Sequence, residues 1–281
     1  MIKIEQPDLD AGEVFSTCIS RVRTSELKVR LNSIKPEIIS GSLLFEQLGT
    51  AKNFYQFIRE DLVGENVTTQ EMEKIYTDRM AKKKAPGREI YDEIKSLAPH
   101  GKCPLCAHRT VSTLDHYLPK THYPVLAVTP LNLVPACSDC NKTKLTDYPT
   151  NANEQTLHPY FDDIEDDYWL IAEVQPSVPA AVIFSVVAPT GWSNTLKNRV
   201  NLHFDSFGLA GLYAAQAADE LLNIRYQLSI IYNVGGAQAV KSELESRAES
   251  CRQHSINSWR TATFDAFSKS EWFCKGGFKA I

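Results

Sequence analysis

The sequence lacks a long apolar run, because no window approaches the roughly 20 uninterrupted apolar residues that a transmembrane helix needs. Its first residues, MIKIEQPDLDAG, lack an apolar core behind a basic stretch, which argues against a signal peptide. No repeat or low-complexity tract is visible, and 43% hydrophobic with 23% charged residues is typical of a globular protein. We therefore expect a cytoplasmic protein whose 281 residues form one large domain or two modest ones.

The chain also lacks an excess of positive charge. It has 30 basic and 34 acidic residues, for a net charge of −4, so the whole-chain charge gives no support to nucleic-acid binding. Residues 99–150 differ, with five basic and three acidic side chains and four of the seven histidines. Side chains that neutralise phosphate are therefore to be sought in this section.

The residue pattern changes near residues 98 and 150, and we predict domain boundaries there. Residues 1–98 indicate a helical region, with an apolar helical stripe from Val14 to Val22 and further helices over about Thr69–Lys83 and Arg88–Leu97. Residues 99–150 are rich in Pro, Cys and His, which is typical of a small metal-stabilised module.

Residues 151–281 change character again. The segments Tyr168–Val174 and Ala181–Val187 are rich in β-branched and aromatic residues and predict a β-hairpin. Two long antiparallel helices follow in the prediction, with Gly235–Gly236 ending the first and an apolar pattern from Val240 to Phe267 forming the second.

Four of the seven cysteines form two CxxC pairs, Cys103 with Cys106 and Cys137 with Cys140. Without a secretion signal, metal binding or free thiols are expected rather than disulfides. Each CxxC turn places two thiolates at two corners of a tetrahedron, so the two turns together predict a zinc site. Because four cysteines leave no open coordination position, the predicted role of the zinc is structural. Two unrelated turns with free thiols are the alternative interpretation.

Polar residues between and after the cysteine pairs can carry chemistry. Asp115 can bind a hard divalent cation, while the adjacent His116, with an ordinary pKa near neutral, can take a proton from water. The amide of Asn132 can hold loop backbone, and the carbonyl oxygen of Asn141 can be a second ligand of the cation. Lys144, about one helical turn later, can face a phosphate.

Each of these residues also has a purely structural interpretation. His116 alone would more often be a surface or satisfied core histidine, and Asp115 can cap a turn. Asn132 lies in a segment suited to an Asx-turn, and Asn141 is a favoured helix N-cap. Only their combination within the cysteine frame points to a common site.

Within the frame of the two CxxC pairs, the chain carries DH, then N, and then a second N directly after the last cysteine. With this combination, residues 100–147 resemble the HNH endonucleases of the ββα-metal fold. In that family a strand carries an acid–histidine pair, a loop asparagine braces it, and a short helix supplies a final metal ligand. The resemblance implies that Asp115 and Asn141 bind Mg²⁺ or Mn²⁺, that His116 is the general base, that Asn132 braces the loop and that Lys144 is the lysine of the CNxxK ending. Asn141 stands where many members have His, which predicts weaker binding of transition metals.

The implied fold class is α+β and mainly helical: a central ββα-metal HNH module with a structural zinc, between an N-terminal helical region and a C-terminal hairpin with long helices. The implied activity is metal-dependent cleavage of nucleic acid, with DNA as the expected substrate. Lys120 and His122 are further candidates for DNA contact, although solvated loop positions explain them more simply. One such site cuts one strand, so a double-strand break favours a dimer or a larger complex.

A wider similarity involves the segments LDHYLPK, TLHPYFD and WFCKGGFK. They are similar to bacterial HNH proteins encoded beside an ATPase in anti-phage systems, most nearly the HNH subunit of Septu-type systems. This resemblance implies an ATPase partner and a role in defence. A zinc-stabilised module that binds nucleic acid or protein without catalysis is the alternative function.

Overall fold

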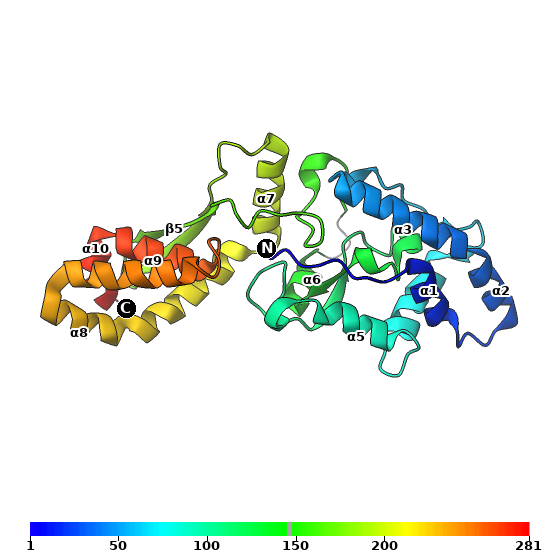
Figure 1. Cartoon of the computed structure of the whole chain (residues 1–281), viewed down its shortest axis with the longest axis horizontal. Helices are drawn as coiled ribbons and strands as arrows, with labels where there is room; N and C mark the ends of the chain where they lie inside the picture. Colours follow the sequence, from blue (N-terminus) through cyan, green and yellow to red (C-terminus); the bar gives the residue numbers. More distant parts are fainter. Residues whose placement is uncertain (145–147, 281) are drawn as a thin grey trace. The chain divides into compact units, whose positions relative to one another are not determined.

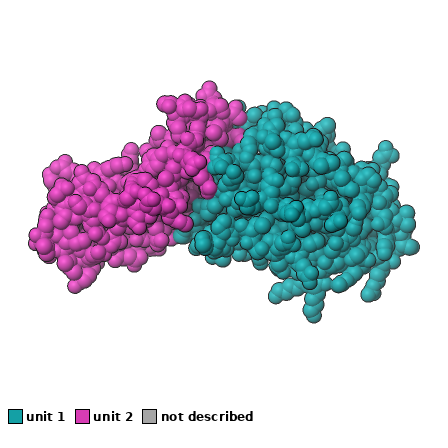
Figure 2. Space-filling model, viewed as in Figure 1, with its two compact units in different colours: residues 1–163 teal, residues 164–281 magenta. Residues whose placement is uncertain are grey.

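The computed structural model describes residues 1–144 and 148–280, except for the side chain of Lys144, and it divides into two compact units (Figures 1 and 2). Unit 1 is Met1–Asp163 and unit 2 is Ile164–Ile281. Over the described residues, helices make up most of the regular structure and the strands occur as three short antiparallel pairs, so the architecture is α+β and mainly helical, as the sequence predicts. The predicted boundaries at 98 and 150 mark changes of sequence pattern within unit 1 and stay predictions. Within the described residues, no helix combines the length and the apolar character needed to cross a membrane.

Unit 1 begins with three helices, α1 (Ala11–Ile19), α2 (Ser25–Ser33) and α3 (Lys35–Thr50). The Asp10 side chain caps α1 by accepting the Glu13 N–H at 2.8 Å, and the apolar stripe of α1 is buried. Helix α1 packs on α3 at Gly12, where an added Cβ would lie 2.9 Å from Ile39. The predicted helical N-terminal region is therefore held together by a close helix contact that a small residue permits.

The next elements of unit 1 are the hairpin of β1 (Leu62–Val63) and β2 (Val67–Thr68), then α4 (Thr69–Tyr76) and α5 (Arg88–Ser96). The predicted helix over Thr69–Lys83 is α-helical only to Tyr76 and continues as a π-helical turn over Thr77–Ala81. Its capping residue is Thr68, which forms a capping box with Glu71. The strand pair presents Thr68 in the extended conformation that a helix N-cap requires.

The middle of the chain has a strand–strand–helix order. Strand β3 (Thr113–His116) pairs antiparallel with β4 (Leu133–Ala136), so that Asp115 lies opposite Val134 and His116 opposite Leu133. Helix α6 (Ser138–Lys144) follows β4 and packs on β3, while α5 packs on both strands. The helices around this hairpin explain why three of the four β3 residues are buried.

Unit 2 contains the predicted hairpin as β5 (Leu170–Gln175) and β6 (Ala181–Val186), followed by α7 (Asn194–Ser206) and α8 (Leu209–Arg252). Figure 1 shows α8 as two arms that run side by side. Gly236 interrupts the helix with φ 64° and ψ −160°, and Gln227 bonds to Glu243 and Arg247 across the break. The predicted pair of antiparallel helical arms separated at the glycines is therefore confirmed.

The prediction of a second helix that continues to Phe267 is wrong. Helix α8 ends at Arg252, and a separate helix, α9 (Trp259–Lys269), begins after Ser258, whose hydroxyl accepts the Thr261 N–H at 3.0 Å. Helix α9 packs on β5, and the short α10 (Glu271–Cys274) follows it. The capping serine and the contact with the hairpin account for the break.

Candidate functional site

The four CxxC cysteines form one buried cluster in unit 1. Cys103, Cys106, Cys137 and Cys140 place their Sγ atoms within 4.8 Å of one another. The backbone N–H groups of Arg109 and Cys140 donate to the Sγ atoms of Cys106 and Cys137, each at 3.4 Å. Antiparallel pairing of β3 with β4 brings the two turns together, because one pair precedes β3 and the other follows β4. The cluster can hold a structural metal ion such as zinc.

The four thiols lie close enough to shift one another's pKa. Hydrogen bonds among the thiols lower the pKa of Cys106 and Cys137, with the pKa of Cys137 at about 6, and they raise the pKa of Cys103 and Cys140. The thiols that keep their protons donate them to those that ionise. A bound divalent cation would take the place of these shared protons and allow all four sulfurs to be thiolates.

Asp115 and His116 lie side by side on β3, and both are buried, with 6% and 8% of their surface exposed. The His116 Nε2 lies 2.9 Å from the backbone oxygen of Ala127. A carbonyl oxygen only accepts hydrogen bonds, so Nε2 carries the proton. In the neutral ring the lone pair is then on Nδ1, so Nδ1 is the nitrogen at which this ring would accept a proton.

Tyr76 is a neighbour of His116 that the sequence did not single out. Its ring packs edge-on against the imidazole, with 4.3 Å between the ring centroids, and its hydroxyl donates to the Leu114 oxygen at 3.3 Å. Burial, with the nearby Tyr91 and Asp115, raises the pKa of Tyr76, so the hydroxyl stays protonated. Lys120 lies over the same ring, with Nζ 5.6 Å from the centroid. Through Tyr76, helix α4 thus contacts both His116 and Lys120. In the sequence, Tyr76 is an ordinary residue of an amphipathic helix.

Asn132 is fully buried and binds the backbone of the loop between β3 and β4 at two points. Its Oδ1 accepts the Leu118 N–H at 2.7 Å, and its Nδ2 donates to the Leu118 and Leu126 oxygens at 2.9 and 3.3 Å. Ala127, whose carbonyl orients His116, is the residue after Leu126. The amide therefore holds in place the part of the loop that positions His116.

Asn141 is half-buried on α6, directly after Cys140. Its backbone N–H donates to the Cys137 oxygen at 3.1 Å, and α6 already begins at Ser138, so Asn141 is not the N-cap of this helix. Because α6 packs on β3, the cysteine cluster, Asn141 and Asp115 belong to one small module. Carboxylate and amide oxygens are the donors that Mg²⁺ and Mn²⁺ prefer, so the residue types fit such an ion.

Lys144 is the last residue of α6, but its side chain lies outside the described residues, and its contact with phosphate stays a prediction. The catalytic and ligand roles of Asp115, His116, Asn132 and Asn141 likewise stay predictions.

Comparison with known proteins gives one informative result. The chain is 28% identical over 299 residues to Protein ea31 of Escherichia phage lambda, and the match covers 98% of this chain and 100% of that protein. The name of that phage protein states no activity. No protein-family model matches the chain, and no solved structure matches it. The similarity shows a phage relative that matches this chain over almost its whole length. It assigns neither a family nor a reaction.

Proposed function

We propose that this protein is a metal-dependent endonuclease of the HNH type, which hydrolyses phosphodiester bonds in nucleic acid, with DNA as the expected substrate. The observation that carries the proposal is the bond between His116 Nε2 and the Ala127 oxygen, on a strand–strand–helix module framed by four cysteines. The bond fixes the proton of the neutral ring on Nε2 and leaves the lone pair on Nδ1, which is the arrangement that a general base acting through Nδ1 needs.

In the proposed reaction, His116 Nδ1 takes a proton from a water molecule as the water oxygen attacks the phosphorus. The bond from phosphorus to the 3′ oxygen breaks, the leaving 3′ oxygen takes a proton from solvent water, and the strand is cut. As the imidazole gains its proton, the Ala127 carbonyl stabilises the resulting cation through the Nε2 hydrogen bond. Asn132 keeps that carbonyl in place through its bonds to Leu118 and Leu126.

The proposal assigns two kinds of metal ion. Zinc would bind the four cysteines and stabilise the module, and Mg²⁺ or Mn²⁺ would bind the oxygens of Asp115 and Asn141. When bound, the second ion supplies Lewis-acid stabilisation of the charge that develops on the phosphate and the leaving oxygen. Lys120, beside the Tyr76 ring, and Lys144 are the proposed contacts with substrate phosphate.

Plasmid cleavage in Mg²⁺ or Mn²⁺ tests the proposal, with zinc measured on the same samples. We expect the wild type to nick or cut, and His116→Ala to lose at least ~100-fold of the rate while keeping one zinc per chain. The matched control is His254→Ala, which removes an exposed histidine from unit 2 and should leave the rate unchanged. A wild type that retains zinc but cuts no nucleic acid in either metal would favour the alternative, a zinc-stabilised binding module without catalysis.

The cellular setting is a further part of the proposal: a cytoplasmic effector that works with an ATPase partner in anti-phage defence, with two copies acting together where both strands are cut. It rests on the sequence similarity given above. Many residues of the similar segments 156–162 and 272–279 are buried, including His158 and Phe278 with none of their surface exposed. Much of that similarity therefore concerns packing, and a partner would have to contact other, exposed residues.

A further inference from the structure

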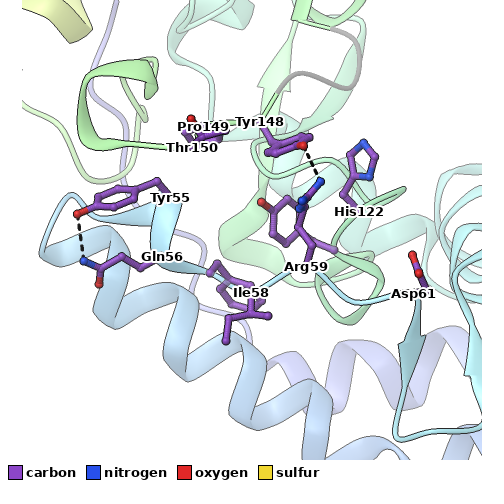
Figure 3. A pocket seen from close by; sticks show the side chains of 11 residues that line it. Tyr55, Gln56, Ile58, Arg59, Asp61, His122, Tyr148, Pro149 and Thr150 are labelled. Atoms are coloured by element: carbon purple, nitrogen blue, oxygen red, sulfur yellow. Dashed lines mark hydrogen bonds between the residues drawn. The ribbon is translucent and has the colours of Figure 1, made fainter.

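A groove of about 600 Å³ opens in unit 1, and its lining includes none of the residues assigned to the proposed reaction (Figure 3). Three segments form its walls: residues 55–61 after α3, His122 and Tyr123 in the loop between β3 and β4, and residues 148–150. The side chains on which the argument depends are polar or aromatic: Tyr55, Gln56, Arg59, His122, Tyr148 and Thr150. A groove lined in this way suits a ligand that is planar, polar and anionic.

One wall combines a cation with aromatic rings. The Arg59 guanidinium donates to the Tyr148 hydroxyl at 2.5 Å and lies over one face of the Tyr148 ring, 4.4 Å from its centre, which leaves the other face for a base. The His122 ring meets Tyr148 edge-on, with 5.0 Å between the centroids. Figure 3 shows these three side chains gathered together, with Tyr55 and Gln56 on the other side. Arg59 has five N–H donors, so the bond to Tyr148 leaves donors for a phosphate.

The opposite wall offers hydrogen-bonding groups of both kinds. Gln56 donates its amide to the Tyr55 hydroxyl at 3.1 Å, which leaves the amide oxygen and the second amide hydrogen for other bonds. Asp61 also lines the groove, but Figure 3 shows it away from Tyr55 and Gln56, beyond His122. Amides and hydroxyls are suited to the edges of a nucleobase, whose donors and acceptors are available only when the base is unpaired.

The charge of the groove distinguishes between nucleic-acid forms. Among its described lining residues, Arg59 is the one permanent cation. Binding of a duplex backbone depends on many Lys and Arg contacts, whereas single strands are held by fewer cations together with stacking on aromatic rings. The lining therefore matches one phosphate and one exposed base better than the backbone of a double helix.

We infer that this groove binds an unpaired nucleotide, with the base against the Tyr148 and His122 rings and a phosphate at Arg59, so that the substrate strand is single-stranded at the site. This inference deepens the proposed nuclease function and rests on it. His122 is six residues after His116, and six residues span at most about 20 Å. A strand held in the groove therefore lies within about 20 Å of the proposed general base, a distance that a few nucleotides can span.

Fluorescence anisotropy with labelled oligonucleotides tests the inference on the full-length protein, without added Mg²⁺ or Mn²⁺. The probes are a 12-nucleotide thymidine DNA, a 12-nucleotide uridine RNA and a 12-base-pair DNA duplex. The variants are Tyr148→Ala, Tyr148→Phe and Arg59→Ala. Matched controls on α8 are Tyr226→Ala, which removes a tyrosine that is 78% exposed, and Arg225→Ala, which removes an exposed arginine. Zinc content and circular dichroism establish that each variant is folded.

We expect a single strand to bind at least ~10-fold more tightly than the duplex, and Tyr148→Ala to weaken that binding by ~5- to 150-fold, the range found where bases stack on aromatic rings. Tyr148→Phe keeps the ring and should bind within ~3-fold of the wild type, while Arg59→Ala should bind more weakly and with a smaller dependence on salt. Comparison of the two single strands shows whether DNA or RNA is preferred.

Three outcomes would overturn the inference: equal or tighter binding of the duplex, unchanged binding by a folded Tyr148→Ala protein, or no binding of any probe by the wild type. The assay needs no cleavage, so it separates the two proposals. A protein that binds single strands through Tyr148 but never cuts would refute only the nuclease. A protein that cuts through His116 with no effect of Tyr148→Ala would refute only the groove.

Discussion

Replacement of Asn132 by alanine removes the side chain that joins the two parts of the β3–β4 loop. The substitution deletes three hydrogen bonds, to the Leu118 N–H, the Leu118 oxygen and the Leu126 oxygen. The Leu126 oxygen still accepts the Thr129 N–H at 3.2 Å. Both Leu118 groups lose these partners, and Leu118 has none of its surface exposed to water.

The expected cost follows from those two groups. A buried donor or acceptor left without a partner costs about 1–3 kcal/mol, so unit 1 should lose about 3 kcal/mol of its free energy of unfolding. With a urea slope of about 1–3 kcal/mol per molar, the unfolding midpoint should fall by about 1 M or more. Asn132→Asp should be no better, because its second oxygen would face two carbonyl oxygens instead of donating to them.

The two units allow the measurement to be specific. All four tryptophans, Trp169, Trp192, Trp259 and Trp272, belong to unit 2, so tryptophan fluorescence follows unit 2 alone. Far-UV circular dichroism follows both units. We expect Asn132→Ala to lower the urea midpoint of the transition seen only by circular dichroism. Hydrogen exchange should also become faster in residues 117–132.

An exposed asparagine provides the control. Asn32 donates one bond to the Lys28 oxygen on the surface of α2, and Asn32→Ala should change stability by no more than about 0.5 kcal/mol. If Asn132→Ala left the unit 1 midpoint within the range of this control, the Asn132 amide would not be what holds the loop. The account of how Ala127 orients His116 would then be wrong as well.

Three further perturbations have defined outcomes. Cys137→Ser should remove the bound metal and lower the stability of unit 1 without moving the tryptophan transition. Cys251→Ser, which lies outside the cluster, should keep one metal per chain. Equal metal content in both variants would contradict metal binding by the four-cysteine cluster. Glu71→Gln should cost about 1 kcal/mol at pH 7, after allowance for solvent screening of its pair with Arg30. Its hydrogen bond with Arg30 lowers the pKa of Glu71 from 4.5 to about 2, so this stabilisation is complete above the unfolded pKa and is lost as the pH falls toward 2. Urea midpoints of the wild type and the variant should therefore converge between pH 6 and pH 3, and a constant difference would argue against the ion pair. In the plasmid assay, Tyr76→Ala should slow cleavage at least ~10-fold because His116 loses its packing, whereas Tyr76→Phe keeps the ring and should stay near the wild-type rate.

Local pattern was a good guide where neighbours in sequence decide the structure. The hairpin of β5 and β6 and the interruption of α8 at Gly236 were both predicted, because strand propensity and glycine conformation act within a few residues. The predicted helix to Phe267 failed where a distant contact intervenes. The side chain of Asn257 accepts the N–H groups of Trp169 and Leu170 at 3.0 and 3.2 Å, which holds the chain in a turn between α8 and α9.

The sequence by itself determined the secondary-structure class and the spacing that brings two thiols together in each CxxC turn, because both depend on residues less than about one helical turn apart. Only the tertiary structure decided the contacts between distant segments. Pairing of β3 with β4 joins the two cysteine turns, packing of α4 sets Tyr76 against His116, and the groove takes Arg59, His122 and Tyr148 from three separate segments. These contacts depend on which buried faces fit one another, and the spacing of residues along the chain does not contain that information.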